Sequence, residues 1–162
     1  MKSEKMIAAL NKQINAEMYS SYMYLSMAAY FESINLKGFA HWMQKQSNEE
    51  TVHAMKFYKY INERMWRVQL TEIAAPVFEW KSPQDAFEAA LAHEKKVTAM
   101  IYNLMDIAIE TKDYATQSML KWFIDEQVEE EANADEIVNK LKVVGDLSGA
   151  VMFLDHHLGK RE

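Results

Sequence analysis

The chain has 162 residues, a length that fits one domain with a sizeable core and is short for two. It contains no Cys, which excludes disulfides, thiolate metal sites and cysteine nucleophiles and fits a reducing compartment. Its net charge of -6 argues against nucleic acid as a partner, and no apolar stretch approaches the roughly 18 residues of a membrane span. We therefore expect one cytoplasmic domain over residues 1–162, with no nucleic-acid or membrane partner.

The composition favours long helices, because only four Gly and two Pro interrupt the chain. Helical periodicity predicts a first helix over residues 3–33, with Ser3 as its N-cap, and a second over 36–64. Residues 65–82, "MWRVQLTEIAAPVFEWKS", have no helical period and contain Pro76. This segment is expected to be a long extended connection that crosses the length of the molecule.

Three more helical segments follow the connection. Ser82 and Pro83 supply an N-cap and a proline at the first helical position, which opens a third helix that continues to about residue 111. A fourth is expected over 113–144, and a short amphipathic piece over 147–158. Two helical hairpins joined by one long crossover predict an all-α, ferritin-like four-helix bundle with a short fifth helix.

Each of the four long helices carries a carboxylate on the seam that should face the bundle interior. These four residues are Glu17, Glu50, Glu94 and Glu130. Each lies about 12 to 17 residues from the start of its helix, so all four should meet in one layer near the middle of the bundle. No Lys or Arg lies beside them on the seams, and four unpaired buried carboxylates would be very costly to ionise. Bound cations explain the pattern better than retained protons.

Two short motifs sharpen this interpretation. Glu50-x-x-His53 and Gln127-x-x-Glu130 each place two polar side chains on one face of a helix, where they can hold a shared ion. Oxygen ligands with one imidazole and no thiolate favour iron or manganese over a structural zinc site, although zinc could bind. Tyr24, one heptad after the first seam carboxylate, is either an ordinary core residue or a redox or hydrogen-bonding neighbour of the metals.

Less specific signals surround this layer. A single Glu on a predicted seam usually means that the register is wrong, but four in one layer make that coincidence improbable. The run "DEQVEEEA" would ordinarily be a solvated face, yet Glu126 and Glu129 flank the fourth seam and Glu49 adjoins the second, so a flanking cation site is a further hypothesis. The remaining histidines are expected at the surface or at interfaces: His41, His93, His156 and His157.

Four longer stretches closely resemble the non-haem ferritins of bacteria and archaea. They are "NKQINAEMYSSYMYLSMAAYF", "GFAHWMQKQSNEETVHAMKFY", "AFEAALAHEK" and "LKWFIDEQVEEEA", and the resemblance extends over essentially the whole chain. It implies a cage of twenty-four subunits that oxidises Fe(II) with O2 or hydrogen peroxide at a diiron centre. The family stores the product as a ferric mineral.

The resemblance also implies roles for individual residues. It makes the ligands of the first iron Glu17, Glu50 and His53, and those of the second Glu50, Glu94 and Glu130, with Gln127 close to them. A third iron site would consist of Glu49, Glu126 and Glu129 together with Glu130, and Tyr24 matches the tyrosine beside the diiron centre.

At some positions this chain differs from the non-haem ferritins or from related families. Relatives often turn with Gly after the second helix, where this chain has Met65 and Trp66. The acids that line the three-fold channels of animal ferritins match Gln117 and Leu120, so the route of iron uptake does not carry over. Thr51 stands where bacterioferritin has its haem-ligating Met, so no haem is expected.

Three other functions are alternatives. Bacterioferritin would need a second Glu-x-x-His motif, where this chain has Gln127-x-x-Glu130, and a rubrerythrin-like peroxidase would need a Cys-bound iron module. A catalytically silent scaffold or shell would have lost seam ligands, and none is lost here.

Overall fold

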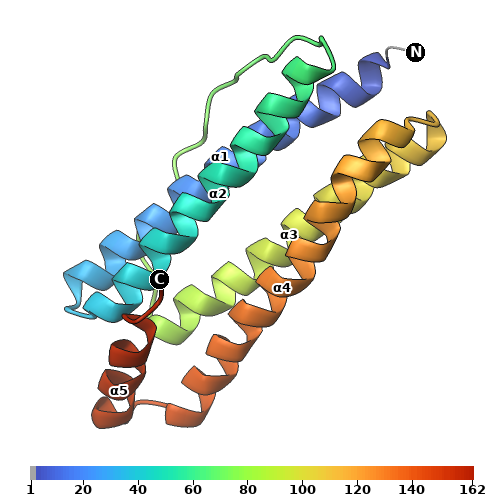
Figure 1. Cartoon of the computed structure of the whole chain (residues 1–162). Helices are drawn as coiled ribbons and strands as arrows, with labels where there is room; N and C mark the ends of the chain where they lie inside the picture. Colours follow the sequence, from blue (N-terminus) through green and yellow to red (C-terminus); the bar gives the residue numbers. More distant parts are fainter. Residues whose placement is uncertain (1–2) are drawn as a thin grey trace.

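A computed structural model describes residues 3–162, and these residues form five α-helices and no strand (Figure 1). The helices are α1 (Glu4–Ser33), α2 (Lys37–Glu63), α3 (Pro83–Glu110), α4 (Tyr114–Val144) and α5 (Ser148–Leu158). The ends of each helix lie within one residue of the predicted ends, and the predicted all-α bundle is confirmed. Among the described residues, no helix combines the length and the apolar character needed to cross a bilayer.

Side-chain caps fix where three of the long helices begin. Ser3, Ser82 and Asp113 each accept a hydrogen bond from the backbone N–H three residues further on, at 3.1–3.2 Å. Each bond satisfies one of the amide groups that have no partner within the first helical turn. The predicted caps at Ser3 and Ser82 are therefore confirmed.

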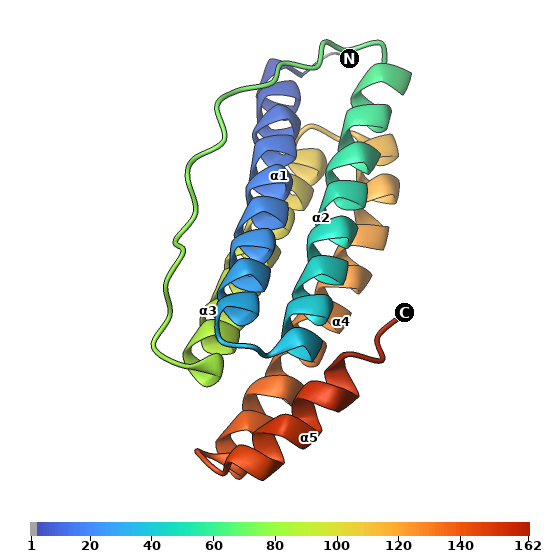
Figure 2. The same cartoon turned by 90° about the vertical axis from the view of Figure 1, so that its left-hand side faces the viewer.

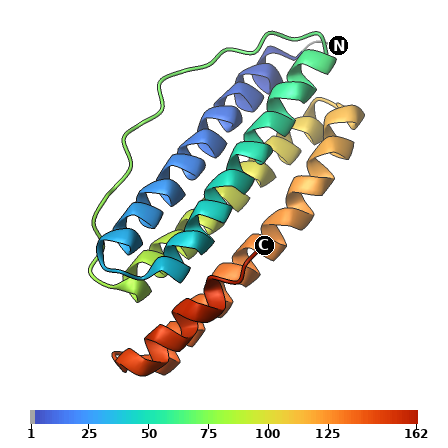
Figure 3. The same cartoon turned by 60° about the vertical axis from the view of Figure 1, so that its left-hand side comes forward.

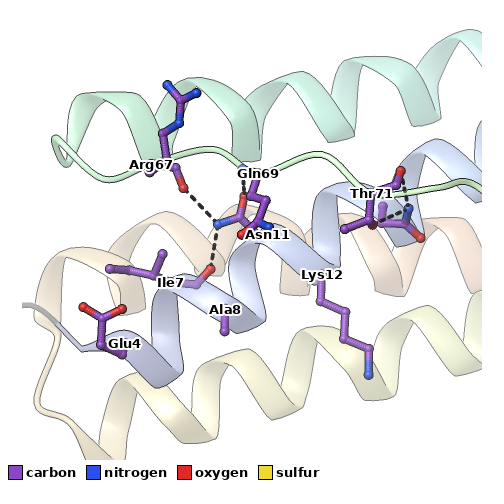
Figure 4. A pocket seen from close by; sticks show the side chains of 9 residues that line it. Glu4, Ile7, Ala8, Asn11, Lys12, Arg67, Gln69 and Thr71 are labelled. Atoms are coloured by element: carbon purple, nitrogen blue, oxygen red, sulfur yellow. Dashed lines mark hydrogen bonds between the residues drawn. The ribbon is translucent and has the colours of Figure 1, made fainter.

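The connection between α2 and α3 is extended and lies along α1 (Figure 3). The Asn11 amide nitrogen donates to the Arg67 carbonyl at 3.1 Å, and its oxygen accepts from the Gln69 N–H at 2.6 Å (Figure 4). One helical turn later, the Asn15 amide nitrogen donates to the Thr71 hydroxyl at 3.0 Å and to the Glu72 carbonyl at 2.9 Å. The connection thus returns the chain to the far end of the bundle, and α3 runs parallel to α2 (Figure 2).

The turn after α2 accommodates its two bulky residues by sending them in opposite directions. Met65 has a φ of 56°, in the left-handed region that favours glycine, and its side chain is exposed. Trp66 is buried, and the Arg64 guanidinium lies 4.1 Å from the centroid of its ring. Within the subunit, Trp66 therefore closes this end of the core, while Met65 points to the surface.

The apolar core is divided into two clusters at opposite ends of the bundle. One contains Phe31, Phe39 and Phe87, whose rings pack with centroids 5.0 to 5.9 Å apart. The other contains Phe57 and Phe123, stacked at 4.0 Å. On each long helix, the buried seam carboxylate lies between the segments that form the two clusters.

Helix α5 packs against the start of α2 through a contact that only glycine allows. A Cβ at Gly38 would lie 1.7 Å from the carbonyl oxygen of Asp155, far inside van der Waals contact. The Asp155 carboxylate also accepts a hydrogen bond from the Phe39 N–H at 2.9 Å. The backbones of α2 and α5 are therefore in direct contact at Gly38, and this contact fixes where the chain after α5 emerges.

Replacing Gly38 with Ala should displace α5 and lower the free energy of unfolding by about 1–3 kcal/mol, as overpacking does in a tight core. Denaturant unfolding measures the change. Gly149→Ala is the matched control, because a Cβ at Gly149 meets no atom within 4 Å. Equal stability of the Gly38→Ala variant and the wild type would contradict this account of the α5 contact.

Candidate metal centre

The four seam carboxylates and His53 meet in one buried layer. Glu17 comes from α1, Glu50 and His53 from α2, Glu94 from α3 and Glu130 from α4. All five are between 1 and 4% exposed. The layer predicted from helical periodicity is therefore present, and its members come from all four helices of the bundle.

The ligand-type atoms of this layer fall into two groups that share one residue. Glu17, Glu50 and His53 each offer an atom within 4.8 Å of the others, and so do Glu50, Glu94 and Glu130. Glu50 belongs to both groups, and its Oε2 lies 3.2 Å from His53 Nδ1. The arrangement can hold two cations side by side, bridged by the Glu50 carboxylate.

Glu17 supplies a direct sign that the layer fits a cation. Its Oε1 accepts a hydrogen bond from Gln13 Nε2 at 3.0 Å, but its Oε2 is buried with no hydrogen-bond partner. A buried carboxylate oxygen without a partner carries a large desolvation penalty, which a metal ligand bond would offset. Oxygen donors with one imidazole suit iron or manganese.

Glu94 is held from both sides by neutral donors. The Tyr24 hydroxyl donates to its Oε1, and Gln127 Nε2 donates to its Oε2 at 3.1 Å. Tyr24 and Gln127 therefore both lie at the layer, where the sequence predicted them. In this structure both act on Glu94 as hydrogen-bond donors.

Two further amides contact the carboxylates and were not among the predicted site residues. Gln13 bonds Glu17, and Gln46 Nε2 donates to Glu130 Oε2 at 2.7 Å and to Glu50 Oε1 at 3.2 Å. Each Gln lies four residues before a seam carboxylate on the same helix, which places the two side chains on one face. That spacing would have identified both.

Burial dominates the electrostatics of the layer. It raises the pKa of Glu17 and Glu50 well above the ordinary value, with further increases from the charge of Glu50 on Glu17 and of Glu94 on Glu50. The pKa of Glu94 is also raised by burial, and that of Glu130 reaches about 8, from burial and from the charge of Glu94. The metal-free layer therefore retains protons near neutral pH, which bound metal must displace.

The flanking site is only partly assembled. Glu126 and Glu130 offer atoms within 4.8 Å of one another and of His53, whose Nε2 lies 3.7 Å from Glu126 Oε1. Across residues 3–162, however, no such cluster includes Glu49 or Glu129. Glu129 is exposed, and Glu49 Oε2 is paired with Arg161 at 2.9 Å.

The other histidines differ in their surroundings. His156 and His157 are exposed, as predicted, while His41 is half-buried. His93 is half-buried as well, with Nε2 2.7 Å from the Ser20 hydroxyl. Burial lowers the pKa of His93 to about 4, so its ring is neutral near pH 7.

The raised pKa of Glu130 predicts a pH-dependent stability of the metal-free protein. Its folded value of about 8 exceeds the ordinary 4.5, so the folded chain holds the extra proton and stability is lost as pH rises through 8. Between pH 7 and 9, where His93 contributes little, unfolding free energy should fall by about 1 kcal/mol from this group. Denaturant unfolding at both pH values should show a smaller fall in Glu130→Gln, and equal falls would contradict the assignment.

Comparisons with known proteins agree with this geometry. A family model described as a ferritin-like domain matches residues 7–144. A bacterial non-heme ferritin of Bacteroides fragilis is 46% identical over 99% of this chain and 100% of its own length, and one of Staphylococcus aureus is 40% identical over 99% and 97%. Among solved structures, an open pore ferritin of Archaeoglobus fulgidus is 51% identical, covers 100% of both chains and has a TM-score of 0.99. The chain therefore belongs to the ferritin family.

Proposed function

We propose that this ferritin binds Fe(II) in the buried layer, oxidises it there and stores the ferric product as a mineral inside a homo-oligomeric cage, with twenty-four subunits as the expected number. The whole chain would act as one domain in the cytoplasm. The observation that carries the proposal is the Glu50 carboxylate, which belongs to both groups of ligand-type atoms. A shared carboxylate brings two metal ions close enough to act on one oxidant.

In this proposal the two groups are the two iron sites. Glu17, Glu50 and His53 would bind one Fe(II), and Glu50, Glu94 and Glu130 the other. Each Fe(II) gives up one electron. With O2 as the oxidant, two electrons and two protons yield hydrogen peroxide, and with peroxide the same two electrons and two protons yield water.

The neutral groups around Glu94 would orient it for this chemistry. Tyr24 and Gln127 engage its two oxygens, so the carboxylate cannot rotate freely when metal arrives. The hydrogen bond to Glu94 also places Tyr24 beside the site as a redox neighbour of the metals. Burial and the charge of Glu94 raise the pKa of Tyr24 well above the ordinary value, so the resting phenol is protonated. A third cation would bind beside the layer, at Glu49, Glu126, Glu129 and Glu130.

The alternatives have less support. Thr51, at the position of the haem-ligating Met in bacterioferritin, is bonded to the Ser21 hydroxyl at 2.9 Å, and its neighbour Val52 is exposed and offers no thioether. We therefore propose a protein without haem, which would show no Soret band at a fixed ratio to subunits. A catalytically silent shell is disfavoured because each predicted ligand residue of the layer is present in the chain and buried.

Replacing Glu50 with Ala should slow aerobic Fe(II) oxidation by at least about a hundredfold, because both iron sites lose their shared ligand. The initial rate of Fe(III) formation, with no more than two Fe(II) added per subunit, measures this change. Glu63→Ala is the matched control, since Glu63 is an exposed residue of the same helix that pairs with Lys59 at 3.6 Å. Wild-type rates in Glu50→Ala would refute the proposed ferroxidase.

A further inference from the structure

The chain after α5 returns to α2 and places one arginine against it. The Arg161 guanidinium lies over the Trp42 ring, 4.4 Å from its centroid, and its Nη1 donates to the Trp42 carbonyl at 3.1 Å. The Arg161 carbonyl oxygen lies 2.6 Å from His41 Nε2. Only 19% of the Arg161 side chain is exposed. These contacts fix the guanidinium on α2 at Trp42, eight residues before Glu50.

The other terminal nitrogen of Arg161 joins the layer to the flanking site. Nη2 lies 3.0 Å from Gln46 Oε1 and 2.9 Å from Glu49 Oε2. Gln46 contacts the carboxylates of the layer, whereas Glu49 belongs to the proposed flanking site. One cationic group therefore reaches both parts of the centre.

The contact with Gln46 determines which way its amide points. Because the oxygen accepts from Arg161, the amide nitrogen faces the layer, where it donates to Glu50 and Glu130. With the opposite orientation, the amide oxygen would face two carboxylates. Arg161 thus maintains a neutral donor beside the ligands.

The contact with Glu49 has a different consequence. A positive charge already satisfies this carboxylate, and Glu49 is absent from the cluster formed by His53, Glu126 and Glu130. A metal ion that uses Glu49 must share it with the guanidinium or displace it. The fixed charge of Arg161 also repels an incoming cation.

We propose that Arg161 is a positioning residue that holds Glu49 away from the flanking site and makes this site weaker than the two central ones. The proposal rests on the proposed function, because it assigns an order of filling to the same centre. Iron would occupy the central layer first, and the flanking site would bind only when the ion pair opens. Arg161, which is not itself a ligand, acts through Glu49.

Calorimetric titration of the metal-free, full-length protein with Zn²⁺, a redox-inert probe, tests the proposal. Arg161→Gln should leave the two tight sites in place and tighten the weaker site about two- to fivefold, the range expected when a partly exposed ion pair is removed. Lys160→Gln is the matched control, because it removes the same charge from an adjacent exposed residue and should leave the weak affinity unchanged.

Two further variants separate positioning from a merely structural role. Arg161→Lys keeps a charge for Glu49 and should restore wild-type weak affinity. In a Glu49→Gln background, Arg161→Gln should have a smaller effect on the weak Zn²⁺ affinity, because the ion pair through which Arg161 holds Glu49 is gone. Unchanged or weakened flanking affinity in Arg161→Gln, an equal effect of Lys160→Gln, or an undiminished effect without Glu49 would each overturn the proposal.

The titration also separates this inference from the proposed function. If the two tight sites are missing from the wild type, the diiron assignment fails, whatever Arg161 does. If the tight sites are present but no weaker site occurs in either the wild type or Arg161→Gln, the diiron assignment survives and the role of Arg161 is overturned. A weak site that emerges only in Arg161→Gln supports the proposal.

Discussion

The burial of four carboxylates in one layer is the constraint on which the rest of this structure depends. Glu17, Glu50, Glu94 and Glu130 are each almost inaccessible to water, and a single imidazole is the only potentially cationic side chain within the layer. Such a layer opposes folding unless protons or cations neutralise it. The raised pKa values show the first means of neutralisation, and the pair of ligand groups around Glu50 provides for the second.

The rest of the fold provides the stability that offsets the cost of burying this layer. Two apolar clusters, one on each side of the layer, hold the helices together without help from its charges. The long crossover makes α3 parallel to α2, so that one seam of each helix meets the others at the same height. Neutral amides and a phenol complete the surroundings, because Gln13, Gln46, Gln127 and Tyr24 all donate to the carboxylates.

Much of this could be predicted from the sequence, because it depends on local periodicity. Helix ends follow from caps such as Ser82, and the height of each carboxylate follows from its distance to the start of its helix. The pairing of Arg161 with Glu49 could not be predicted, because it joins residues 112 positions apart through the packing of α5 on Gly38. The contact between His93 and Ser20 depends likewise on how α1 meets α3, which seam spacing does not determine.

Thermal unfolding of a metal-free quadruple variant tests the central claim most directly. In this variant Glu17, Glu50, Glu94 and Glu130 are each replaced by Gln, which keeps their shape and removes their charge. Because the carboxylates serve metal chemistry while the apolar clusters serve folding, the variant should melt at or above the temperature of the metal-free wild type. Native mass spectrometry should show the same assembly. A variant that fails to fold or assemble, beside a stable metal-free wild type, would show that the carboxylates are themselves structural and would contradict this account.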